Sequence, residues 1–283
     1  KLTRMKKRVT SPILWTFALS FFVFSCQKNS QIRPKAIIPE ITHFVEHTDT
    51  RLHFVSLGDP YAPPILFIHG APGNWKAYNT LLQDSVLRSR FHIISVDRLG
   101  YGKSRKRKQK VVTSIVQQAD AIAEALHVNL SGEKALIIGR SYGAAIAAEI
   151  GIRYAEKTKK IFMISPVIDP DKEKYFWFAY AAKHWFVRQF LSLDLIAATD
   201  EKFAHERELR KIQEDWHNLR VPTTVFMGGR DWIADLGNFH FAKKKLKKEN
   251  SKFIYIPDAG HMIAETHPQI VLSEILDTSP ITP

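Results

Sequence analysis

Short apolar runs recur along the chain, and helical patterns fill most of the intervals between them. Several runs are apolar at successive positions, which is typical of strands covered on both faces. The expected strands are residues 51–57, 64–69, 91–97, 134–139, 160–165, 223–228 and 252–257. The expected helices are residues 75–88, 111–126, 142–156, 236–248 and 268–276. This alternation predicts an α/β fold with a mostly parallel central sheet, helices on both faces, and a site at the carboxyl ends of the strands.

Residues 167–220 interrupt the alternation, because they carry helical sequence without a strand. Their first half is aromatic, at 175–180 and 185–186, and their second half is heavily charged, at 200–215. Since the first half is apolar nearly all round, we expect a helix buried on several sides. Inserted between two strands, the segment would form a small helical lid, with ordinary core helices as the alternative.

The N-terminal region has the pattern of an export signal. A basic head at residues 5–8 precedes an apolar run at 13–24, which is short for a membrane span and typical of a secretory signal peptide. An uncleaved anchor is the alternative. The run ends at Cys26, the only cysteine, so no intrachain disulfide can form. Residues 23–26 resemble the lipobox of bacterial lipoproteins, although Phe24 is bulkier than usual. This resemblance implies cleavage before Cys26 and lipid attachment to its sulfur.

These features divide the chain into a signal peptide (1–25), a polar tether (26–42), an α/β core (43–166 and 221–283) and the lid (167–220). The lipobox resemblance implies a bacterial protein that is exported and anchored, with Gln27 after the cysteine favouring the outer membrane. Removal of the five basic residues before Cys26 would lower the formal net charge from +13 to +8. The basic clusters 103–110 and 243–248 lack an aromatic platform, so no nucleic-acid partner is expected. Contact with anionic lipid headgroups and ordinary solvent-exposed surface are both consistent with these clusters.

The candidate catalytic residues lie where three expected strands end. Gly139-Arg140-Ser141-Tyr142-Gly143 joins a strand pattern to a helix pattern, which favours a sharp turn exposing one hydroxyl. A serine needs a base to attack a carbonyl, and the base needs an orienting carboxylate. Asp231 and His261 each follow a later strand, in the order Ser–acid–His. Asp235 and Asp258 are the alternative acids, and His267 is the alternative base.

Acyl transfer also requires donors for an oxyanion. The amide of Tyr142 is one, and the loop His69-Gly70-Ala71-Pro72-Gly73 after an early strand supplies another. Because Pro72 has no N–H, Ala71 is the expected second donor. The glycine-rich loop 97–104 is interpreted as structural.

With these motifs in place, residues 45–278 resemble the α/β-hydrolase superfamily, in its lidded branch with a His-Gly-x-Pro oxyanion loop. The resemblance implies that Ser141 is the nucleophile, Asp231 the acid and His261 the base, with oxyanion amides from Ala71 and Tyr142. It also implies a lid after the sixth strand of that fold. The epoxide-hydrolase and haloalkane-dehalogenase branches resemble this one but use aspartate as nucleophile, so the serine at position 141 argues against both. The turn at residues 139–143, here called the elbow, also departs from the Gly-Gly-Ser-Trp-Gly sequence typical of proline iminopeptidases.

The resulting hypothesis is a membrane-anchored serine hydrolase that cleaves small carboxylic esters with an apolar acyl part through an acyl-enzyme. The expected acyl pocket is lined by Trp75, Phe176, Trp177, Tyr180 and Trp185. No metal cluster or cofactor fingerprint is visible. The same triad could instead act on an amide, a lactone, a thioester or a diketone carbon–carbon bond, since fold and triad do not separate these. A tethered binding protein without activity is a further alternative.

Overall fold

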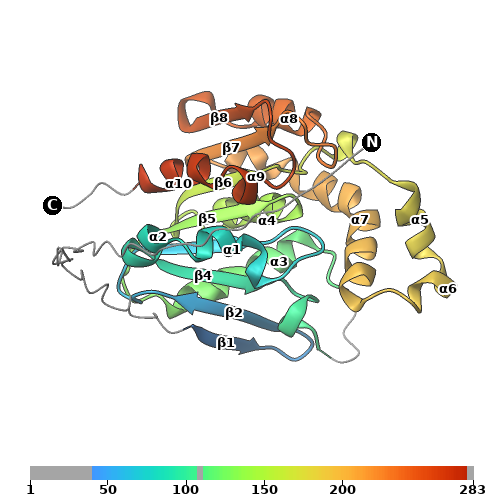
Figure 1. The fold of residues 1–283 in the computed structure, drawn as a ribbon, viewed down its shortest axis with the longest axis horizontal. Helices are drawn as coiled ribbons and strands as arrows, with labels where there is room; N and C mark the ends of the chain where they lie inside the picture. Colours follow the sequence, from blue (N-terminus) through green and yellow to red (C-terminus); the bar gives the residue numbers. More distant parts are fainter. Residues whose placement is uncertain (1–39, 107–110, 279–283) are drawn as a thin grey trace, which may run out of the picture. The chain divides into compact units, whose positions relative to one another are not determined.

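A single mixed sheet organises the part of the chain that the computed structural model describes, residues 40–106 and 111–278 (Figure 1). Its eight strands lie in the order β1-β2-β4-β3-β5-β6-β7-β8. β4, β3, β5, β6, β7 and β8 are parallel, whereas β2 runs antiparallel to β4 and β1 antiparallel to β2. The strands are β1 (Ile41–Glu46), β2 (Arg51–Leu57), β3 (Pro64–Ile68), β4 (His92–Asp97), β5 (Ala135–Arg140), β6 (Thr158–Ile164), β7 (Thr223–Gly228) and β8 (Ser251–Ile256).

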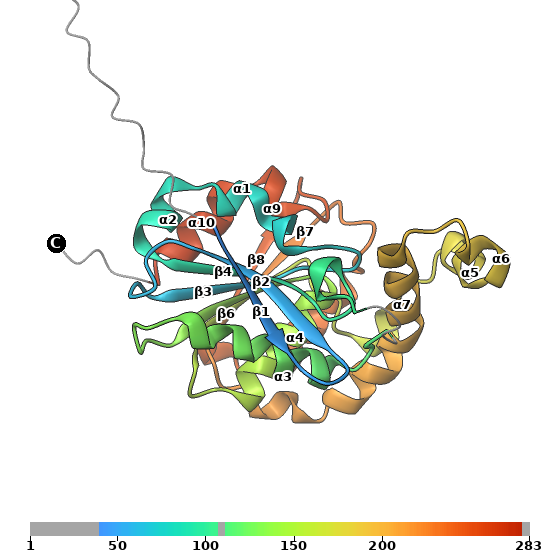
Figure 2. The same ribbon diagram turned by 90° about the horizontal axis from the view of Figure 1, so that it is seen from below.

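Helices cover both faces of this sheet, so successive residues of a strand enter different apolar cores (Figure 2). In β3, Leu66 and Ile68 pack with α3 and α4, while Ile65 and Phe67 pack with the helices of the opposite face. Burial on both sides explains why these strands are apolar without alternation. The helices are η1 (Trp75–Tyr78), α1 (Asn79–Leu82), α2 (Ser85–Arg90), η2 (Gly102–Ser104), α3 (Ile115–Ala123), η3 (Glu124–Val128), α4 (Tyr142–Arg153), η5 (Asp215–Asn218), α8 (Gly237–Lys245), η6 (Lys248–Asn250), α9 (Ile263–Thr266) and α10 (Pro268–Leu276).

The predicted fold class is confirmed, with two differences in detail. The sheet begins at Ile41, inside the segment expected to be a tether. Its first strand, β1, is half-exposed and pairs only with β2, so it lacks the apolar run of a buried strand. The expected helix over 75–88 is divided into η1, α1 and α2. The division occurs because Asp84 leaves the helical conformation and accepts hydrogen bonds from the amides of Val86 and Leu87, at 2.9 Å each, which starts α2.

Between β6 and β7 the chain forms the helical segment expected from the sequence. It contains η4 (Pro170–Lys172), α5 (Trp177–Lys183), α6 (Trp185–Arg188) and the long α7 (Leu193–Ile212). α7 lies beside the carboxyl edge of the sheet, and α5 and α6 lie further out (Figures 1 and 2). The expectation that the aromatic helix is buried on several sides was wrong. α5 buries only Ala179 and rests on α7 through the rings of Tyr175 and Tyr180 against Phe203.

The predicted signal peptide and Cys26 lie outside the described residues, as do residues 107–110 of one basic cluster. Across residues 40–106 and 111–278, no helix has both the length and the apolar character that a membrane crossing requires.

Candidate active site

Ser141 lies at a strained turn between β5 and α4. Its φ of 55° is a conformation that residues other than glycine rarely adopt. A Cβ at Gly139 would lie 2.3 Å from the carbonyl oxygen of Gly143, and one at Gly143 would lie 2.5 Å from that of Ile68. Side chains at these two positions would clash with backbone. Both glycines are therefore required for the turn that presents the serine hydroxyl at the sheet edge.

Asp231 and His261, the candidate acid and base, lie in direct contact. Nδ1 of His261 lies 2.8 Å from Oδ2 of Asp231, whose other oxygen accepts hydrogen bonds from the amides of Ile233 (2.9 Å) and Ala234 (2.8 Å). The Asp231 side chain is fully buried and that of His261 is 10% exposed. Because a carboxylate can only accept, Nδ1 donates this hydrogen bond, an arrangement in which Nε2 is the ring nitrogen that can exchange a proton with a substrate or nucleophile.

The loop that carries His261 crosses the sheet towards Ser141. A Cβ at Gly228, the last residue of β7, would lie 2.4 Å from the carbonyl oxygen of Ala259, so the loop after β8 passes directly over the end of β7. An ion pair between Arg140 and Glu265 then joins the end of β5 to α9. These contacts fix the base relative to the serine turn.

The alternative acids and base have other partners. Asp235 accepts a hydrogen bond from the amide of Gly237 (2.8 Å) and pairs with Lys174, and these two interactions lower the pKa of its carboxyl. Asp258 pairs with His267 at 3.5 Å on the surface. Asp231 is thus the acid placed against the candidate base.

The loop after β3 packs against the serine. A Cβ at Gly70 would lie 3.1 Å from Cβ of Ser141, which is tighter than ordinary van der Waals contact, so glycine at this position favours the close approach. Ala71 follows Gly70 and lines the same cavity as Ser141 and Tyr142. The loop is held by His69, whose Nδ1 donates to the carbonyl of Gly70 (2.6 Å) while its Nε2 accepts from the Arg98 amide (3.0 Å). Burial, reinforced by the Arg98 charge, keeps the pKa of His69 well below its ordinary value.

A buried ion pair beneath this loop joins it to α7. The Arg98 guanidinium contacts both carboxylate oxygens of Glu201, at 2.7 and 2.9 Å, and neither side chain is exposed. Arg98 also donates to the Gly70 carbonyl (3.2 Å) and lies 4.6 Å from the ring centres of both Tyr101 and Tyr142. Burial disfavours its charge, but Glu201 and then Tyr101 outweigh that effect and raise the pKa of Arg98. No sequence pattern indicated this pair, whose members are 103 residues apart.

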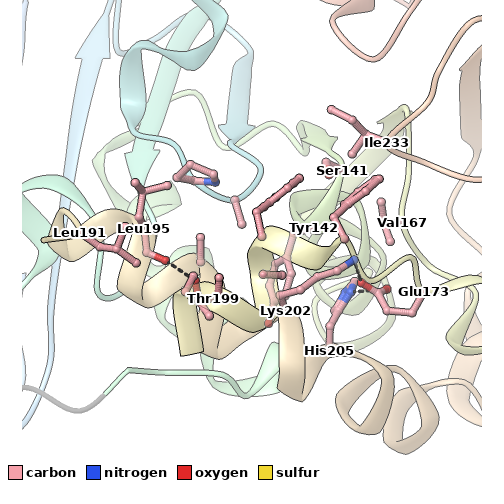
Figure 3. Close-up of a pocket in the computed structure, with 18 of the residues that line it drawn as sticks. Ser141, Tyr142, Val167, Glu173, Leu191, Leu195, Thr199, Lys202, His205 and Ile233 are labelled. Atoms are coloured by element: carbon pink, nitrogen blue, oxygen red, sulfur yellow. Dashed lines mark hydrogen bonds and ion pairs between the residues drawn. The ribbon is translucent and has the colours of Figure 1, made fainter. Parts of the chain in front are cut away.

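A cavity of about 510 Å³ opens between Ser141 and the helices α5, α6 and α7 (Figure 3). Its lining is mostly apolar, and Phe176 belongs to it as predicted. The lining consists of Ala71, Pro72, Ser141, Tyr142, Val167, Glu173, Phe176, Phe178, Ala179, Ala181, Ala182, Val187, Leu191, Leu195, Ala198, Thr199, Lys202, His205, Trp232 and Ile233.

The assignment of Trp75, Trp177, Tyr180 and Trp185 to this pocket was wrong. Ala179, Ala181, Ala182 and Phe178 line the cavity, whereas Trp177, Tyr180 and Trp185 are exposed and absent from its lining. Trp75 instead packs against the apolar core on the face of the sheet that α1 and α10 cover.

The match to known proteins agrees with this geometry. The family model described as "Alpha/beta hydrolase family" matches residues 65–274, most of the chain. The chain belongs to the alpha/beta hydrolase family. It is 22% identical to "Epoxide hydrolase 3" of Mus musculus, over 80% of this chain and 72% of that protein. It is 23% identical to "Proline iminopeptidase" of Xylella fastidiosa (strain 9a5c), over 78% of this chain and 75% of that protein.

Among solved structures, a 2-hydroxy-6-oxo-6-phenylhexa-2,4-dienoate hydrolase from Rhodococcus sp. strain RHA1 has the same fold. The TM-score is 0.67 at 16% identity, over 85% of this chain and 99% of that one. Membership of the family and these hydrolase relatives establish that the protein is a hydrolase. Since the relatives named here have different activities, the family alone does not select the bond.

The hydrolase cavity has a polar end that sequence patterns did not indicate. Glu173 is paired with Lys202 and accepts a hydrogen bond from Nδ1 of His205 at 3.0 Å (Figure 3). Burial favours the neutral acid, but His205 and Lys202 outweigh it and lower the pKa of Glu173. The His205 ring also stacks on Tyr142, with 4.4 Å between ring centres. The cluster therefore braces the residue that follows the serine. In the described residues, no three His, Cys, Asp or Glu side chains are grouped as a metal site requires.

Replacing Glu201 with Gln should lower the free energy of unfolding of the hydrolase by about 3–5 kcal/mol. The substitution leaves the buried Arg98 charge without its counter-charge. Urea denaturation of the purified protein measures the change. Glu206→Gln on the same helix is the matched control, because its ion pair with Arg210 is solvent-exposed and should contribute less than about 1 kcal/mol. Equal losses in the two variants would contradict a special role of the buried pair.

Proposed function

We propose that this hydrolase cleaves carboxylic esters with an apolar acyl part, through an acyl-enzyme on Ser141. The observation that carries the proposal is the His261–Asp231 hydrogen bond at the same sheet edge as the strained serine turn. The mostly apolar cavity that begins at Ser141 supports the choice of acyl group. A buried carboxylate orienting a histidine is the arrangement that activates a serine hydroxyl.

In the proposed reaction, Oγ of Ser141 attacks the ester carbonyl carbon and its proton passes to Nε2 of His261. The negative charge on the carbonyl oxygen is stabilised by the amides of Ala71 and Tyr142. The tetrahedral intermediate collapses, the alcohol leaves with the proton from His261, and Ser141 retains the acyl group. A water molecule, deprotonated by His261, then attacks the acyl carbon and releases the acid. Asp231 stabilises the imidazolium in both halves.

The serine also argues against the activity named for the epoxide-hydrolase relatives. Attack of a serine oxygen on an epoxide carbon would give an ether, which lacks a carbonyl for water to attack. An ester formed with a carbonyl substrate has one, so the second half-reaction can proceed. An amide, a lactone, a thioester or a carbon–carbon bond next to a carbonyl would pass through the same intermediate, and these remain the alternatives.

The nucleophile is tested with a fluorophosphonate probe, which should label the wild-type protein and fail to label Ser141→Ala. The same substitution should lower kcat on any accepted ester by roughly 10⁶-fold, because the acyl-enzyme can no longer form. Ser165→Ala is the matched control, since Ser165 also follows a strand of the sheet with a positive φ of 45°. Labelling that persists in Ser141→Ala, or an intact wild type that stays unlabelled, would defeat the proposal.

Bond type and acyl length are tested together with a panel of p-nitrophenyl esters, aminoacyl amides and lactones. We expect esters to be the preferred class. Their kcat/KM should rise about fourfold for each added methylene until the cavity is filled, because burial of one methylene is worth about 0.8 kcal/mol. A flat dependence on acyl length would refute the apolar acyl site. Preference for aminoacyl amides would favour a peptidase.

We also propose that the enzyme is exported and anchored through a lipid on Cys26, from the signal-like run and the residues that resemble a lipobox. In a bacterial host, metabolic labelling with radioactive palmitate should mark the wild-type protein and not Cys26→Ser. Equal incorporation into the two proteins would place the lipid elsewhere, and no incorporation into either would reject the anchor.

A further inference from the structure

The outward side of the lid helices carries a patch of exposed aromatic and aliphatic side chains, here called the lid patch. Trp177 is 81% exposed and Phe190 is 75% exposed, and ring contacts run from Trp185 to Phe186 and on to Phe190. Soluble surfaces seldom leave so many large apolar groups together in water. The lid patch consists of Trp177, Phe178, Tyr180, Trp185, Phe186, Phe190, Leu193 and Leu195.

This patch is continuous with the cavity that leads to Ser141. Phe178 and Leu195 belong to both, since each is exposed on the outside and also lines the cavity. Trp232, on the loop that carries the candidate acid, is a third exposed residue of the lining. An apolar molecule held at the lid patch would therefore reach the serine without leaving an apolar surface.

The aromatic stretch of the patch carries only positive charges, and Asp194, between Leu193 and Leu195, is paired with Arg105. Between Tyr175 and Leu193 the chain has no Asp or Glu, but it has Lys183 and Arg188. Lys183 lies 4.4 Å from the ring centre of Phe203, and Arg188 pairs with Asp200 of α7. Aromatic rings combined with cations are the composition that proteins place at the interface of anionic membranes.

We propose that the lid patch inserts into an anionic lipid surface, from which acyl chains enter the cavity. α5 and α6 lie at the outer end of the lid and bury little of themselves, so their apolar groups are free to enter the headgroup region (Figures 1 and 2). The entry of acyl chains rests on the proposed ester hydrolysis, whereas the contact with lipid does not.

The contact is tested in the full-length chain with its single cysteine moved. A nitroxide is attached to Phe190→Cys or, as control, to Tyr61→Cys, both in a Cys26→Ser background. Tyr61 is 67% exposed in the loop before β3, at the opposite edge of the sheet from Ser141. With vesicles of phosphatidylcholine and phosphatidylglycerol, the label at position 190 should gain access to oxygen and lose access to a water-soluble nickel chelate. The label at position 61 should keep its aqueous behaviour.

The consequence for activity is tested with Trp185→Ser/Phe186→Ser, which changes two patch residues outside the cavity lining. Hydrolysis of a long-chain ester presented in the same vesicles should fall at least about tenfold, because two buried aromatic groups are lost from the contact. Hydrolysis of a short p-nitrophenyl ester in water should be unchanged. Tyr61→Ser/Leu130→Ser, two exposed residues far from the lid, is the matched control and should keep both activities.

Two results would overturn the lipid contact. One is a label at position 190 that stays accessible to the nickel chelate when vesicles are added. The other is a label that becomes protected without vesicles as the protein concentration rises, which would mean that a second copy covers the patch. If no ester is hydrolysed by any variant, the proposed function fails while the labelling result still decides the contact.

Discussion

The buried ion pair between Arg98 and Glu201 is the interaction on which the arrangement of the site depends. Arg98 reaches the loop after β3 through the Gly70 carbonyl, lies against the ring of Tyr142, and binds Glu201 of α7. Three segments far apart in the sequence are thereby held by one guanidinium. A planar cation with several donors suits this role, because it can bond a carboxylate with two contacts and still reach a third acceptor. Because Arg98 is buried, losing one of these contacts would leave part of its charge uncompensated and would destabilise the protein.

This attachment divides the lid into two parts with different physical character. α7 is tied to the core by the buried ion pair of Glu201 with Arg98 and by stacking of His205 on Tyr142, one turn further on. α5 and α6 contact α7 through aromatic rings and through the partly exposed ion pair of Arg188 with Asp200. The wall of the cavity nearest the serine is therefore held by buried interactions, and the outer wall by more exposed ones. A small group of alanines on the inner side leaves the cavity open, and the rings of Trp177, Tyr180 and Trp185 are exposed on the outside.

The family relationship and the site give information at different levels. Similarity to an epoxide hydrolase and to a proline iminopeptidase establishes the fold and the hydrolase class. The family alone does not select the bond that is cleaved. In the proposed mechanism, a serine instead of a carboxylate at position 141 determines which covalent intermediate can be hydrolysed. The apolar lining of the cavity then restricts the part of the substrate that can lie beside it.

The sequence by itself determined the sheet, the elbow and the candidate acid–base pair, because each depends on local rules. Buried strands require apolar runs, a sharp strand–helix turn requires glycines, and residues after parallel strands meet at one edge. The edge strand β1 was not predicted, because its half-exposed pattern resembles that of a polar linker. Only the tertiary structure decided that Arg98 meets Glu201, that Glu173 and Lys202 line the cavity, and that Trp177 and Tyr180 of α5 face outward. An aromatic run is apolar in the sequence whether it faces a core or the solvent, and the helix packed beside it decides between the two.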